Sequence, residues 1–498
     1  MTRYVELRPG TYRDSVSLMQ VSRAVADRPG VRQALVAMAT DLNLALLADM
    51  GFTPPPGATP NDLVLAVEAG DDSGVADALR GAEEALAERV VGDAGGDGDV
   101  PAPRTLATAA GRSPGARLAL VSTPGPVAFA DAVDALDAGL SVMLFSDNVP
   151  VEQEVWLKRE AARRGLLVMG PDCGTAVVSG LGLGFANVVR PGPVGLVAAS
   201  GTGAQHLMSL LDGAGVGVSH CLGVGGRDLS GAVGGLSTHA ALDLLADDPA
   251  TEVVVVVSKP PAPAVAEEVG RHARRLGKPV LLALLGPGAP DLTASARRTV
   301  ETLGADWHEP RWWPAPAERT GRYPTVRGLF AGGTLCQEAL LVAGPMLHGP
   351  LRSNLSPDPA LALDDSLDAR GGHAMVDFGD DRLTRGRPHP MIDQRLRAER
   401  LLREAADPTA GVLLLDVVLG HAAHPDPAAE LAPAVVAARE RAARDGREVA
   451  VVVSLVGTAG DPQGLERQAG ALVAAGASVH LSNAAAAREA AELCADVR

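Results

Sequence analysis

Short apolar runs, each closed by Gly, Asp, Ser or Pro, recur along this chain and alternate with stretches of helical pattern. Two of these runs are "EVVVVVSKPP" (252–261) and "PVLLALLGPG" (279–288), and one helical stretch is "VEQEVWLKREAARRG" (151–165). Strands that alternate with helices of roughly ten to fifteen residues indicate βαβ units and parallel sheets. The sequence therefore predicts an α/β protein. Its candidate ligand sites are the carboxyl ends of the strands.

Composition restricts the function classes. Hydrophobic residues make up 47% of the 498 residues and charged residues 21%, an ordinary globular balance. Aromatic residues are only 3%, while glycine occurs 57 times, so we expect cores of Val, Leu and Ala, as in buried parallel sheets. The formal net charge of −16 argues against sequence-independent nucleic-acid binding, which needs clustered Lys and Arg. A local basic pocket for small anions is compatible with that charge.

The cysteines and the N-terminus point to an ordinary reduced protein. Cys173, Cys221, Cys336 and Cys494 are far apart and form no CxxC pair, so neither a structural zinc nor a disulfide framework is expected. The start "MTRYVELRPGTYRD" lacks the apolar core of a signal peptide, and no run approaches about 18 apolar residues. We expect a soluble cytoplasmic protein without a membrane span.

Four segments follow from the pattern. Residues 1–90 predict a small α/β domain, and a Gly-, Asp- and Pro-rich linker at 90–104 follows it. Strand and helix patterns then alternate through 101–190, and a new series begins after "VVRPG" and runs through 191–310. The Pro-rich, charged stretch 308–325 predicts a second linker. The last series of strands and helices occupies 325–498.

"VAASGTGAQHL" (197–207) is the sharpest local signal for a binding site. An apolar strand ends at Ser200, and Gly201, Thr202 and Gly203 lead into a helix. Backbone amides at a helix N-terminus, exposed by glycine, bind phosphate or carboxylate with help from the helix dipole. The alternative is that these glycines only serve the geometry of a tight turn.

Two further strand ends carry similar signals. "VGGRDLSG" (224–231) repeats the glycines at Gly225 and Gly226 and adds Arg227, whose planar fork suits carboxylate or phosphate. "VMGPDCGTAV" (168–177) contains Cys173, a candidate thiolate nucleophile if the loop amides lower its pKa. No adjacent base supports that role, and a buried structural cysteine is the favoured interpretation.

Residues 373–393, "HAMVDFGDDRLTRGRPHPMID", predict a strand that ends in a rigid charged loop. Asp380, Asp381, Arg387 and His389 lie in this loop, which is a candidate for binding or catalysis because such loops on a rigid scaffold often carry function. A solvated surface turn is the alternative.

Two other strands add candidates. Lys259 follows one strand as a point charge, and Asp416 lies inside another. His421 and His424 stand in a Pro-bounded loop, where the sequence gives metal binding little support.

A family resemblance can now be stated. The strings "MLFSDN", "MGPDCGT", "ASGTG", "GGRDLS", "SKPP", "AGGTL", "DFGDD", "GRPHPMID" and "LLLDVVLG" occur in the order seen in FdrA-family proteins, which are themselves similar to succinyl-CoA synthetase. By this resemblance 101–190 looks like the Rossmann-type CoA-binding domain, with "GPDCGT" at the place of its "GPNC" loop. Residues 191–310 and 325–498 look like the two flavodoxin-like ligase domains. The loop "DFGDDRLTRGRPHPMID" lies where the second ligase domain carries a glycine-rich loop at the shared phosphate site.

The departures from the synthetase matter as much as the match. Its phosphorylated histidine follows the strand that corresponds to "LLALLGPG", and here no histidine occurs between His272 and His308. Lys259 stands where a supporting glutamate is expected. The chain shows no ATP-grasp domain, and its CoA-type domain lacks the opening glycine-rich loop. ATP-driven thioester formation through phosphohistidine is therefore not expected in this chain.

The resemblance implies one subunit of an oxamate carbamoyltransferase of purine (allantoin) breakdown. This enzyme interconverts oxalurate plus phosphate with oxamate plus carbamoyl phosphate, and works with separate partner subunits in an oligomer. Carbamoyl phosphate and oxamate are both small anions, and acyl transfer to or from phosphate needs a phosphate cradle and an electropositive pocket. No cofactor is implied beyond phosphate or carbamoyl phosphate as substrate, with CoA only as an alternative. No nucleic acid or membrane partner is implied.

The resemblance and the strand-end positions together give the candidate residues. The catalytic candidates are Lys259, Arg387, His389, Asp381 and Asp416. The cationic side chains would neutralise or protonate substrate oxygens, and the aspartates would orient those cations or act as a base for the amide nitrogen. The phosphate- or substrate-binding candidates are Ser200, Gly201, Thr202, Gly203, Gly225, Gly226, Arg227, Asp172, Cys173, Gly174, Thr175, Gly332, Gly333, Thr334 and Asp380. No metal ligand is proposed.

Two rival functions stay open. An acyl-CoA ligase or CoA transferase that relies on a partner chain for nucleotide chemistry is favoured by the "GPDCGT" loop. It is opposed by the missing CoA-type glycine loop and the missing histidine. A non-catalytic scaffold for partner subunits would leave the strand-end charges as folding features.

Overall fold

The computed structural model of the chain describes residues 1–494 apart from residues 12, 14, 94–102, 318–322, 370, 385 and 386. It divides into two compact units. One contains residues 1–140 with 146–148 and 384–388, and the other contains 141–145, 149–383 and 389–498. Among the described residues, no helix is long and apolar enough to cross a membrane. The predicted domain boundaries near 90–101, 190 and 310–325 stay predictions.

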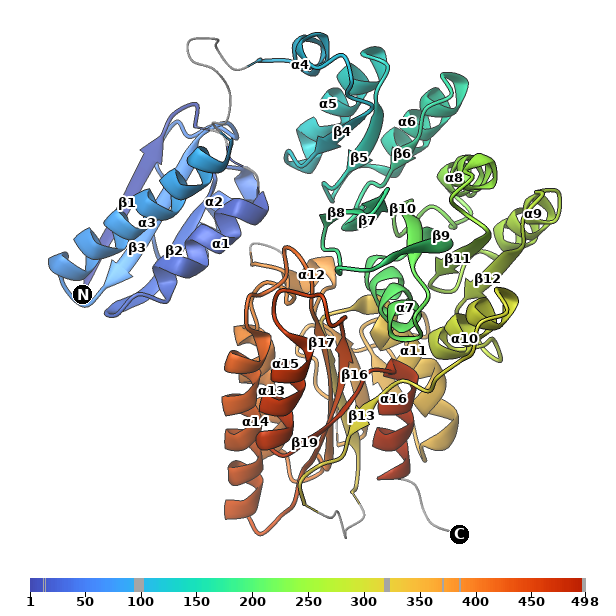
Figure 1. Cartoon of the computed structure of the whole chain (residues 1–498). Coiled ribbons are helices and arrows are strands. Elements are labelled where there is room, and N and C mark those ends of the chain that lie inside the picture. The colour runs from blue at the N-terminus through green and yellow to red at the C-terminus, as the bar shows by residue number, and fades with distance from the viewer. Residues whose placement is uncertain are drawn as a thin grey trace. The chain divides into compact units, whose positions relative to one another are not determined.

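The first unit opens with a three-stranded antiparallel sheet in the order β1-β3-β2. Its strands are β1 (Thr2–Arg8), β2 (Val31–Met38) and β3 (Leu63–Ala69), and its helices are α1 (Ser15–Ala26), α2 (Asp41–Asp49) and α3 (Asp72–Asp93). Every residue of β3 is buried, because one core cluster lies between the sheet and α1 and α3, and a second includes Leu47 of α2 and Phe52 (Figure 1). The strand is apolar along its length because both of its faces are covered. Residues 1–90 form strands and helices of the predicted α/β kind, and α3 includes residues 90–93 of the predicted linker.

The first unit also contains α4 (Leu106–Arg112), β4 (Leu118–Val121) and α5 (Gly125–Asp137). In the second unit the chain continues through β5 (Ser141–Leu144), α6 (Val151–Arg163) and β6 (Val168–Met169), and β5 pairs with β6 in parallel. A hairpin of β7 (Thr175–Val178) and β8 (Leu181–Gly184) follows.

A six-stranded sheet forms next, in the order β12-β11-β9-β10-β7-β8. Its remaining strands are β9 (Pro191–Ala199), β10 (Val218–Gly223), β11 (Val253–Ser258) and β12 (Val280–Leu284), alternating with α7 (Gly201–Gly213), α8 (Leu236–Asp247), α9 (Pro263–Ala273) and α10 (Leu292–Thr302). The four strands from β9 to β12 pair in parallel, as predicted, and the β7–β8 hairpin adds an antiparallel edge that the sequence analysis missed.

A seven-stranded sheet completes the unit, in the order β13-β19-β18-β17-β14-β16-β15. Its strands are β13 (Trp312–Trp313), β14 (Val326–Phe330), β15 (Leu351–Ser353), β16 (His373–Asp377), β17 (Val412–Val418), β18 (Ala450–Val456) and β19 (Ala477–His480). Its helices are α11 (Gly333–Ala343), the short η1 (Gly344–Met346), α12 (Asp381–Thr384), α13 (Arg395–Ala406), α14 (Pro427–Arg444), α15 (Leu465–Ala474) and α16 (Asn483–Glu492). Helices α13, α14 and α15 cover one face and α11 and α16 the other (Figure 1).

The stretch 308–325 was predicted to be only a linker, and this was wrong for its central part. Trp312 and Trp313 form β13, which pairs with β19 in antiparallel fashion at the sheet edge. The indole of Trp312 stacks on His480 with ring centroids 5.6 Å apart, and Arg311 lies over the Trp313 ring. Aromatic packing therefore orders a stretch whose prolines and charges suggested otherwise.

A buried polar cluster joins the helices of the two sheets in the second unit. Glu338 of α11 accepts hydrogen bonds from the backbone N–H of Leu292 (2.6 Å) and from the side-chain amide of Asn483 (2.7 Å). Burial raises the pKa of Glu338 to about 7. The amide oxygen of Asn483 has no partner in this arrangement. The side-chain amide nitrogen of Asn483 also donates to the carbonyl oxygen of Leu335 (3.0 Å), which fixes the orientation of the amide.

This cluster gives a pH prediction. The pKa of Glu338 is above that of an unfolded glutamate, so its contribution to the free energy of unfolding is complete below about pH 4.5 and decreases as pH rises through about 7. Glu338→Gln should remove that part of the slope and stabilise the protein at pH 8 relative to the wild type. Urea unfolding at pH 5, 7 and 8 measures this. Equal slopes in both proteins would show that Glu338 does not titrate as described.

Candidate functional site

Two helix N-termini, one from each large sheet of the second unit, meet at the candidate site. Ser200 caps α7, and its hydroxyl accepts a hydrogen bond from the N–H of Gly203 (3.0 Å). The same Ser200 Oγ lies 2.6 Å from Oγ1 of Thr334, in the first turn of α11. Gly332 precedes α11 without any side-chain cap. The N–H groups of Gly203 and Gly332 are taken by Ser200 and Asp416. Those of residues 201, 202, 333 and 334 make no hydrogen bond with the described residues, so both first turns keep amides that can bind an anion. We call residues 200–203 and 332–334 the cradle.

Glycine permits this close approach. A Cβ added to Gly332 would lie 2.8 Å from Oγ1 of Thr202, and one added to Gly203 would lie 2.9 Å from Cγ2 of Thr334. Real Cβ atoms essentially never come so near to other heavy atoms, so larger residues would separate the helices. The glycines predicted from "ASGTG" and "AGGTL" therefore serve close packing in addition to exposing amides.

Lys259 and Asp377 flank the start of α11. A Cβ added to Gly333 would lie 3.1 Å from Nζ of Lys259 and under 3 Å from Oδ2 of Asp377. Lys259 follows β11 and is partly exposed, and its ammonium makes no hydrogen bond or ion pair with the described residues. Asp377, the last residue of β16, is 4% exposed. Burial raises the pKa of Asp377 to about 7, against the opposing effect of Lys259.

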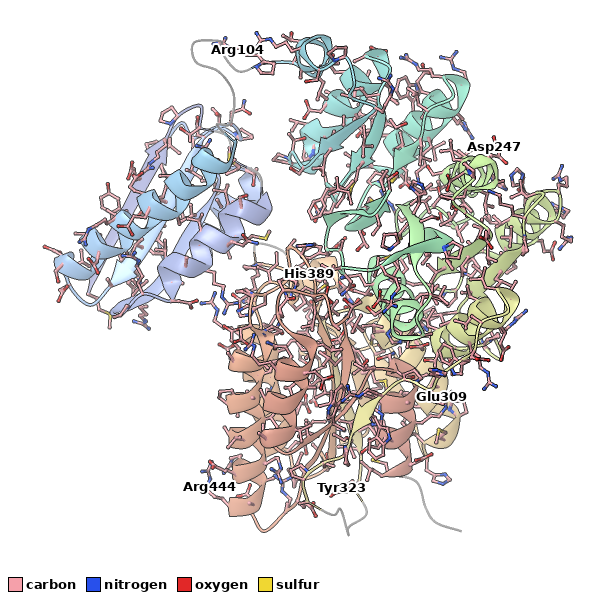
Figure 2. All side chains as sticks on the ribbon, in the orientation of Figure 1. Arg104, Asp247, Glu309, Tyr323, His389 and Arg444 are labelled. Carbon is pink, nitrogen blue, oxygen red and sulfur yellow. The ribbon has the colours of Figure 1, made fainter. Side chains whose placement is uncertain are left out.

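His389 lies on the other side of Asp377. A Cβ added to Gly379 would lie 2.8 Å from Nε2 of His389 and 3.1 Å from Oδ1 of Asp377. Nδ1 of His389 accepts from the backbone N–H of Met391 (3.2 Å), which assigns the proton of the neutral ring to Nε2. Burial and the nearby Arg397 lower the pKa of His389 to about 4, so the ring is neutral at pH 7. His389 therefore presents an N–H donor at Nε2. Figure 2 labels His389 among the side chains.

Asp416 anchors the glycine loop from beneath. Its carboxylate accepts from the N–H groups of Ala331 (2.6 Å) and Gly332 (2.8 Å) and from the guanidinium of Arg397 (2.6 Å). Asp416 and Arg397 are both fully buried. Asp416 was predicted among the catalytic residues that orient cations. It does orient one, Arg397, and it holds the backbone of the cradle residue Gly332, but both of its oxygens are occupied by protein groups.

The strand ends at 170–175 and 223–227 pack against each other. A Cβ on Gly225 would lie 2.5 Å from the carbonyl oxygen of Pro171, and one on Gly223 would lie 2.6 Å from Sγ of Cys173. Burial raises the pKa of Cys173 to about 12, which agrees with the structural interpretation of this cysteine. Gly226 faces Asp172, and Gly174 lies near Phe185. Thr175 alone of this group reaches the cradle, next to Gly201.

Arg227 is occupied by protein groups. Its guanidinium donates to the carbonyl oxygen of Val149 (2.7 Å) and pairs with the buried Glu154 (2.9 Å). The structure does not bring Arg227 to the cradle, although its chemistry alone suggested phosphate binding.

Three of the remaining loop candidates, Asp381, Arg387 and His421, are exposed. Asp380 pairs with Arg382, and Asp381 is exposed at the start of α12. Arg387 is exposed and belongs to the segment 384–388 of the first unit, so its proposed role stays a prediction. His421 is exposed, whereas Nδ1 of the buried His424 accepts from the N–H of Asp426 (2.8 Å). Among the described residues no group of three or more His, Cys, Asp or Glu is arranged to hold a metal.

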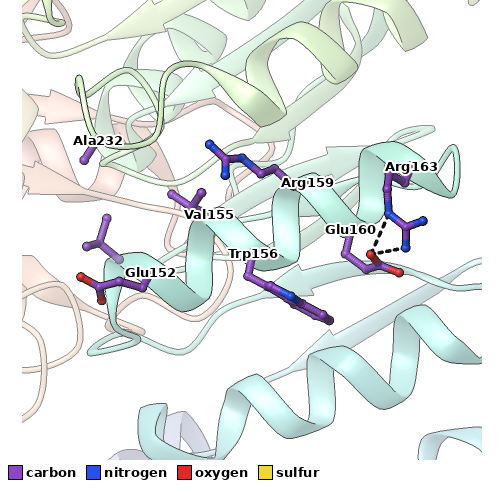
Figure 3. Close-up of a pocket in the computed structure, with 8 residues that line it drawn as sticks. Glu152, Val155, Trp156, Arg159, Glu160, Arg163 and Ala232 are labelled. Carbon is purple, nitrogen blue, oxygen red and sulfur yellow. Dashed lines mark hydrogen bonds and ion pairs between the residues drawn. The ribbon is translucent and has the colours of Figure 1, made fainter.

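A surface pocket of about 630 Å³ lies elsewhere, along α6 (Figure 3). Val155, Trp156 and Arg159 line it, with Glu160 in an ion pair with Arg163. It contains none of the predicted site residues.

Comparison with known proteins places the chain in a family. The chain is 39% identical over 497 residues to the uncharacterized protein YahF of Escherichia coli K12, covering 96% of this chain and 95% of that protein. It belongs to the YahF family. Its residues 1–102 match the "AllF, heavy metal-associated domain" family and its residues 329–493 match the CoA-ligase family.

More distant relatives agree with the fold. The alpha subunit of the ADP-forming succinate–CoA ligase of Methanothermobacter thermautotrophicus is 29% identical over 34% of this chain and 58% of that subunit. The chain is also similar to a solved dinucleotide-forming acetyl-coenzyme A synthetase of Ca. Korarchaeum cryptofilum, with 17% identity and a TM-score of 0.29. The match covers 77% of this chain and 85% of the synthetase chain. The predicted α/β class, resembling acyl-CoA ligases, is confirmed.

The heavy-metal name of the N-terminal family does not fit this chain. Residues 1–102 contain neither cysteine nor histidine, the ligands that soft transition metals prefer. No metal chemistry is derived for this domain.

Sequence reasoning missed Asp377 and Phe185. Asp377 stands in the quoted "DFGDD", but the residues predicted from that string were Asp380 and Asp381. A carboxylate that ends a buried strand is the signal that could have found it. Phe185 packs against His389 with ring centroids 6.0 Å apart. Only the β7–β8 hairpin brings it there, and the sequence pattern did not show that hairpin.

The Asp416–Arg397 pair gives a stability prediction. Asp416→Ala should lower the free energy of unfolding by about 3–5 kcal/mol, because it leaves a buried guanidinium without its carboxylate. The double change Asp416→Leu with Arg397→Met should cost less than the single change. Denaturant unfolding measures both. A double variant that is less stable than Asp416→Ala would contradict the view that the uncompensated charge dominates.

Proposed function

We propose that this chain is one subunit of a carbamoyltransferase. It interconverts oxalurate plus phosphate with oxamate plus carbamoyl phosphate, in allantoin breakdown and together with separate partner subunits. The observation that carries the proposal is the cradle, in which two helix N-termini lie against each other. The ammonium of Lys259 lies beside them and pairs with none of the residues that the structure describes. The AllF-type N-terminal domain and the CoA-ligase domain support an enzyme-like protein of this pathway.

The cradle suits phosphate and acyl phosphate chemistry. Amides of the first turns of α7 and α11 would hold the phosphoryl oxygens, with the hydroxyl of Thr202 beside them. Lys259 would neutralise charge on the phosphate. The neutral Nε2–H of His389 would donate to an oxygen that becomes negative as the carbamoyl carbon is attacked, as in other oxyanion sites. Oxamate carries a carboxylate, so both reactants need such positive surroundings.

An acyl-CoA ligase-like activity is the second candidate, favoured by the match of residues 329–493 to CoA-ligase. Two observations weigh against it. Residues 273–307 hold no histidine that could carry phosphate, and the loop at 170–175 is packed closely against 223–225. Binding of CoA by the purified chain would favour this candidate.

Lys259→Met tests the proposal. Loss of a charge-assisted contact of about 1.5–3 kcal/mol predicts roughly 10- to 100-fold weaker binding of carbamoyl phosphate. It should also lower carbamoyl transfer in the complex with its partner subunits. Arg271→Met is the matched control, since it removes one positive charge near the exposed end of α9.

Calorimetric titration with phosphate, carbamoyl phosphate, oxamate, CoA and ATP provides the readout. Tight binding of CoA or ATP without any binding of carbamoyl phosphate or phosphate would overturn the transferase in favour of the ligase.

A further inference from the structure

One carboxylate oxygen at the cradle lacks a protein partner. Oδ1 of Asp377 accepts from the N–H of Gly379 (2.9 Å), and the backbone of Asp377 is bound on both sides by the Asn354 side chain. Oδ2 receives no hydrogen bond from the described residues, and it points at Gly333, the first residue of α11. The side chain is thus fixed by one oxygen and presents the other to the anion site.

The packing of Asp377 keeps it from forming a close ion pair. Lys259 Nζ lies on the same side of Gly333, but the two groups form no salt bridge within 4.0 Å. Asp416, a buried carboxylate that raises the pKa of Asp377, is itself paired with Arg397 and two amides. An anion in the cradle would therefore meet a carboxyl group that is held at the site but not neutralised there.

We infer that Asp377 is the proton-transfer group of the cradle, which binds the anion while carrying a proton and exchanges that proton with the substrate nitrogen. The inference rests on the proposed function for the identity of that nitrogen. The coupling between anion binding and protonation of Asp377 requires only that a phosphate-like ligand occupies the cradle.

The chemical step balances without a further reactant. A phosphate oxygen attacks the carbamoyl carbon of oxalurate, the C–O bond forms and the C–N bond to the oxamate nitrogen breaks. The leaving nitrogen takes the proton of Asp377, because an amide anion is too basic to leave unprotonated. The proton of hydrogen phosphate then restores Asp377. In the reverse direction the Asp377 carboxylate removes a proton from the oxamate amide as it attacks carbamoyl phosphate. No atom is oxidised or reduced.

The groups around Asp377 set the pH at which it exchanges its proton. Burial raises its pKa to about 7, Asp416 and Asp380 act in the same direction, and Lys259 opposes them. Cys336 of α11 is a buried neighbour whose own pKa is raised well above its usual value, and His389 is already neutral. Asp377 is therefore the group facing the cradle that changes its charge between pH 6 and 8.

Sulfate is the probe for a direct test, because it resembles a phosphate dianion and itself exchanges no proton between pH 6 and 8.5. Calorimetric titration of the full chain should show sulfate affinity falling above about pH 7, by up to about tenfold per pH unit, as Asp377 becomes negative. Asp377→Asn should bind sulfate with no such dependence, and more tightly than the wild type at pH 8.5. The asparagine keeps an oxygen for the N–H of Gly379.

Two further variants make the test specific. Glu338→Gln removes the other carboxyl group whose pKa is about 7, and it should leave the pH dependence of sulfate binding unchanged. Lys259→Met removes the cation that lowers the pKa of Asp377, so the midpoint should move to higher pH. This variant keeps the inference testable if Asp377→Asn does not fold, and a structural role for Asp377 would not move the midpoint.

The outcomes separate the inference from the proposed function. An unchanged pH dependence in Asp377→Asn, or an unmoved midpoint in Lys259→Met, would overturn the role of Asp377 even if the complex transfers carbamoyl groups. If sulfate binding depends on pH as described but the complex transfers no carbamoyl group, the coupling between Asp377 and the anion stands and the proposed carbamoyltransferase reaction is wrong. Absence of sulfate binding at every pH would overturn both.

Discussion

The mutual approach of two positive helix ends is the constraint on which this site depends. Each helix N-terminus carries roughly half a positive charge, and here α7 and α11 come together through the Ser200–Thr334 contact. At a separation of roughly 6 Å and an effective dielectric constant of about 20, two such ends repel each other by about 0.7 kcal/mol. This repulsion is small. Asp416 offsets part of it by accepting hydrogen bonds from the N–H groups of Ala331 and Gly332, just before α11. A dianion above the helix ends would interact with both and reverse the balance.

Much of the fold could be predicted from the sequence, since buried parallel strands are recorded as continuous apolar runs. β11, β17 and β18 lie where such runs ended at Lys259, Gly420 and Gly457. The β7–β8 hairpin, β13 and β15 were not predicted, because they are short edge strands held by packing against distant segments. Asn187, for example, fixes the end of the hairpin by donating to the carbonyl of Leu419 and to Asp461. Such contacts span more than two hundred residues of sequence and leave no local pattern.

The site was predicted in outline and corrected in its parts. Glycine-rich strand ends at 200–203 and 332–334 do come together, although they follow β9 and β14 of two different sheets. Residue chemistry alone could not say which charged side chains remain available. Arg227 and Asp416 look as functional in the sequence as Lys259, but each is paired inside the protein. Asp377 looks like a core residue by its place in a buried strand, and only its orientation toward Gly333 distinguishes it.

The same packing that leaves the cradle open closes the other glycine-rich strand ends. At 170–175 and 223–227 the glycines are needed because backbone and side-chain atoms fill the space where a Cβ would stand, and the charged groups pair with one another. Lys158, Glu154 and Asp228 form a fully buried ion triad beneath this loop, which would lose its compensation if the loop moved to admit a ligand. At the cradle the glycines face another helix start, and Lys259 and Asp377 keep unpaired atoms. Glycine-rich strand ends in one chain can thus serve opposite purposes, and the pairing of the neighbouring charges separates a structural loop from a binding site.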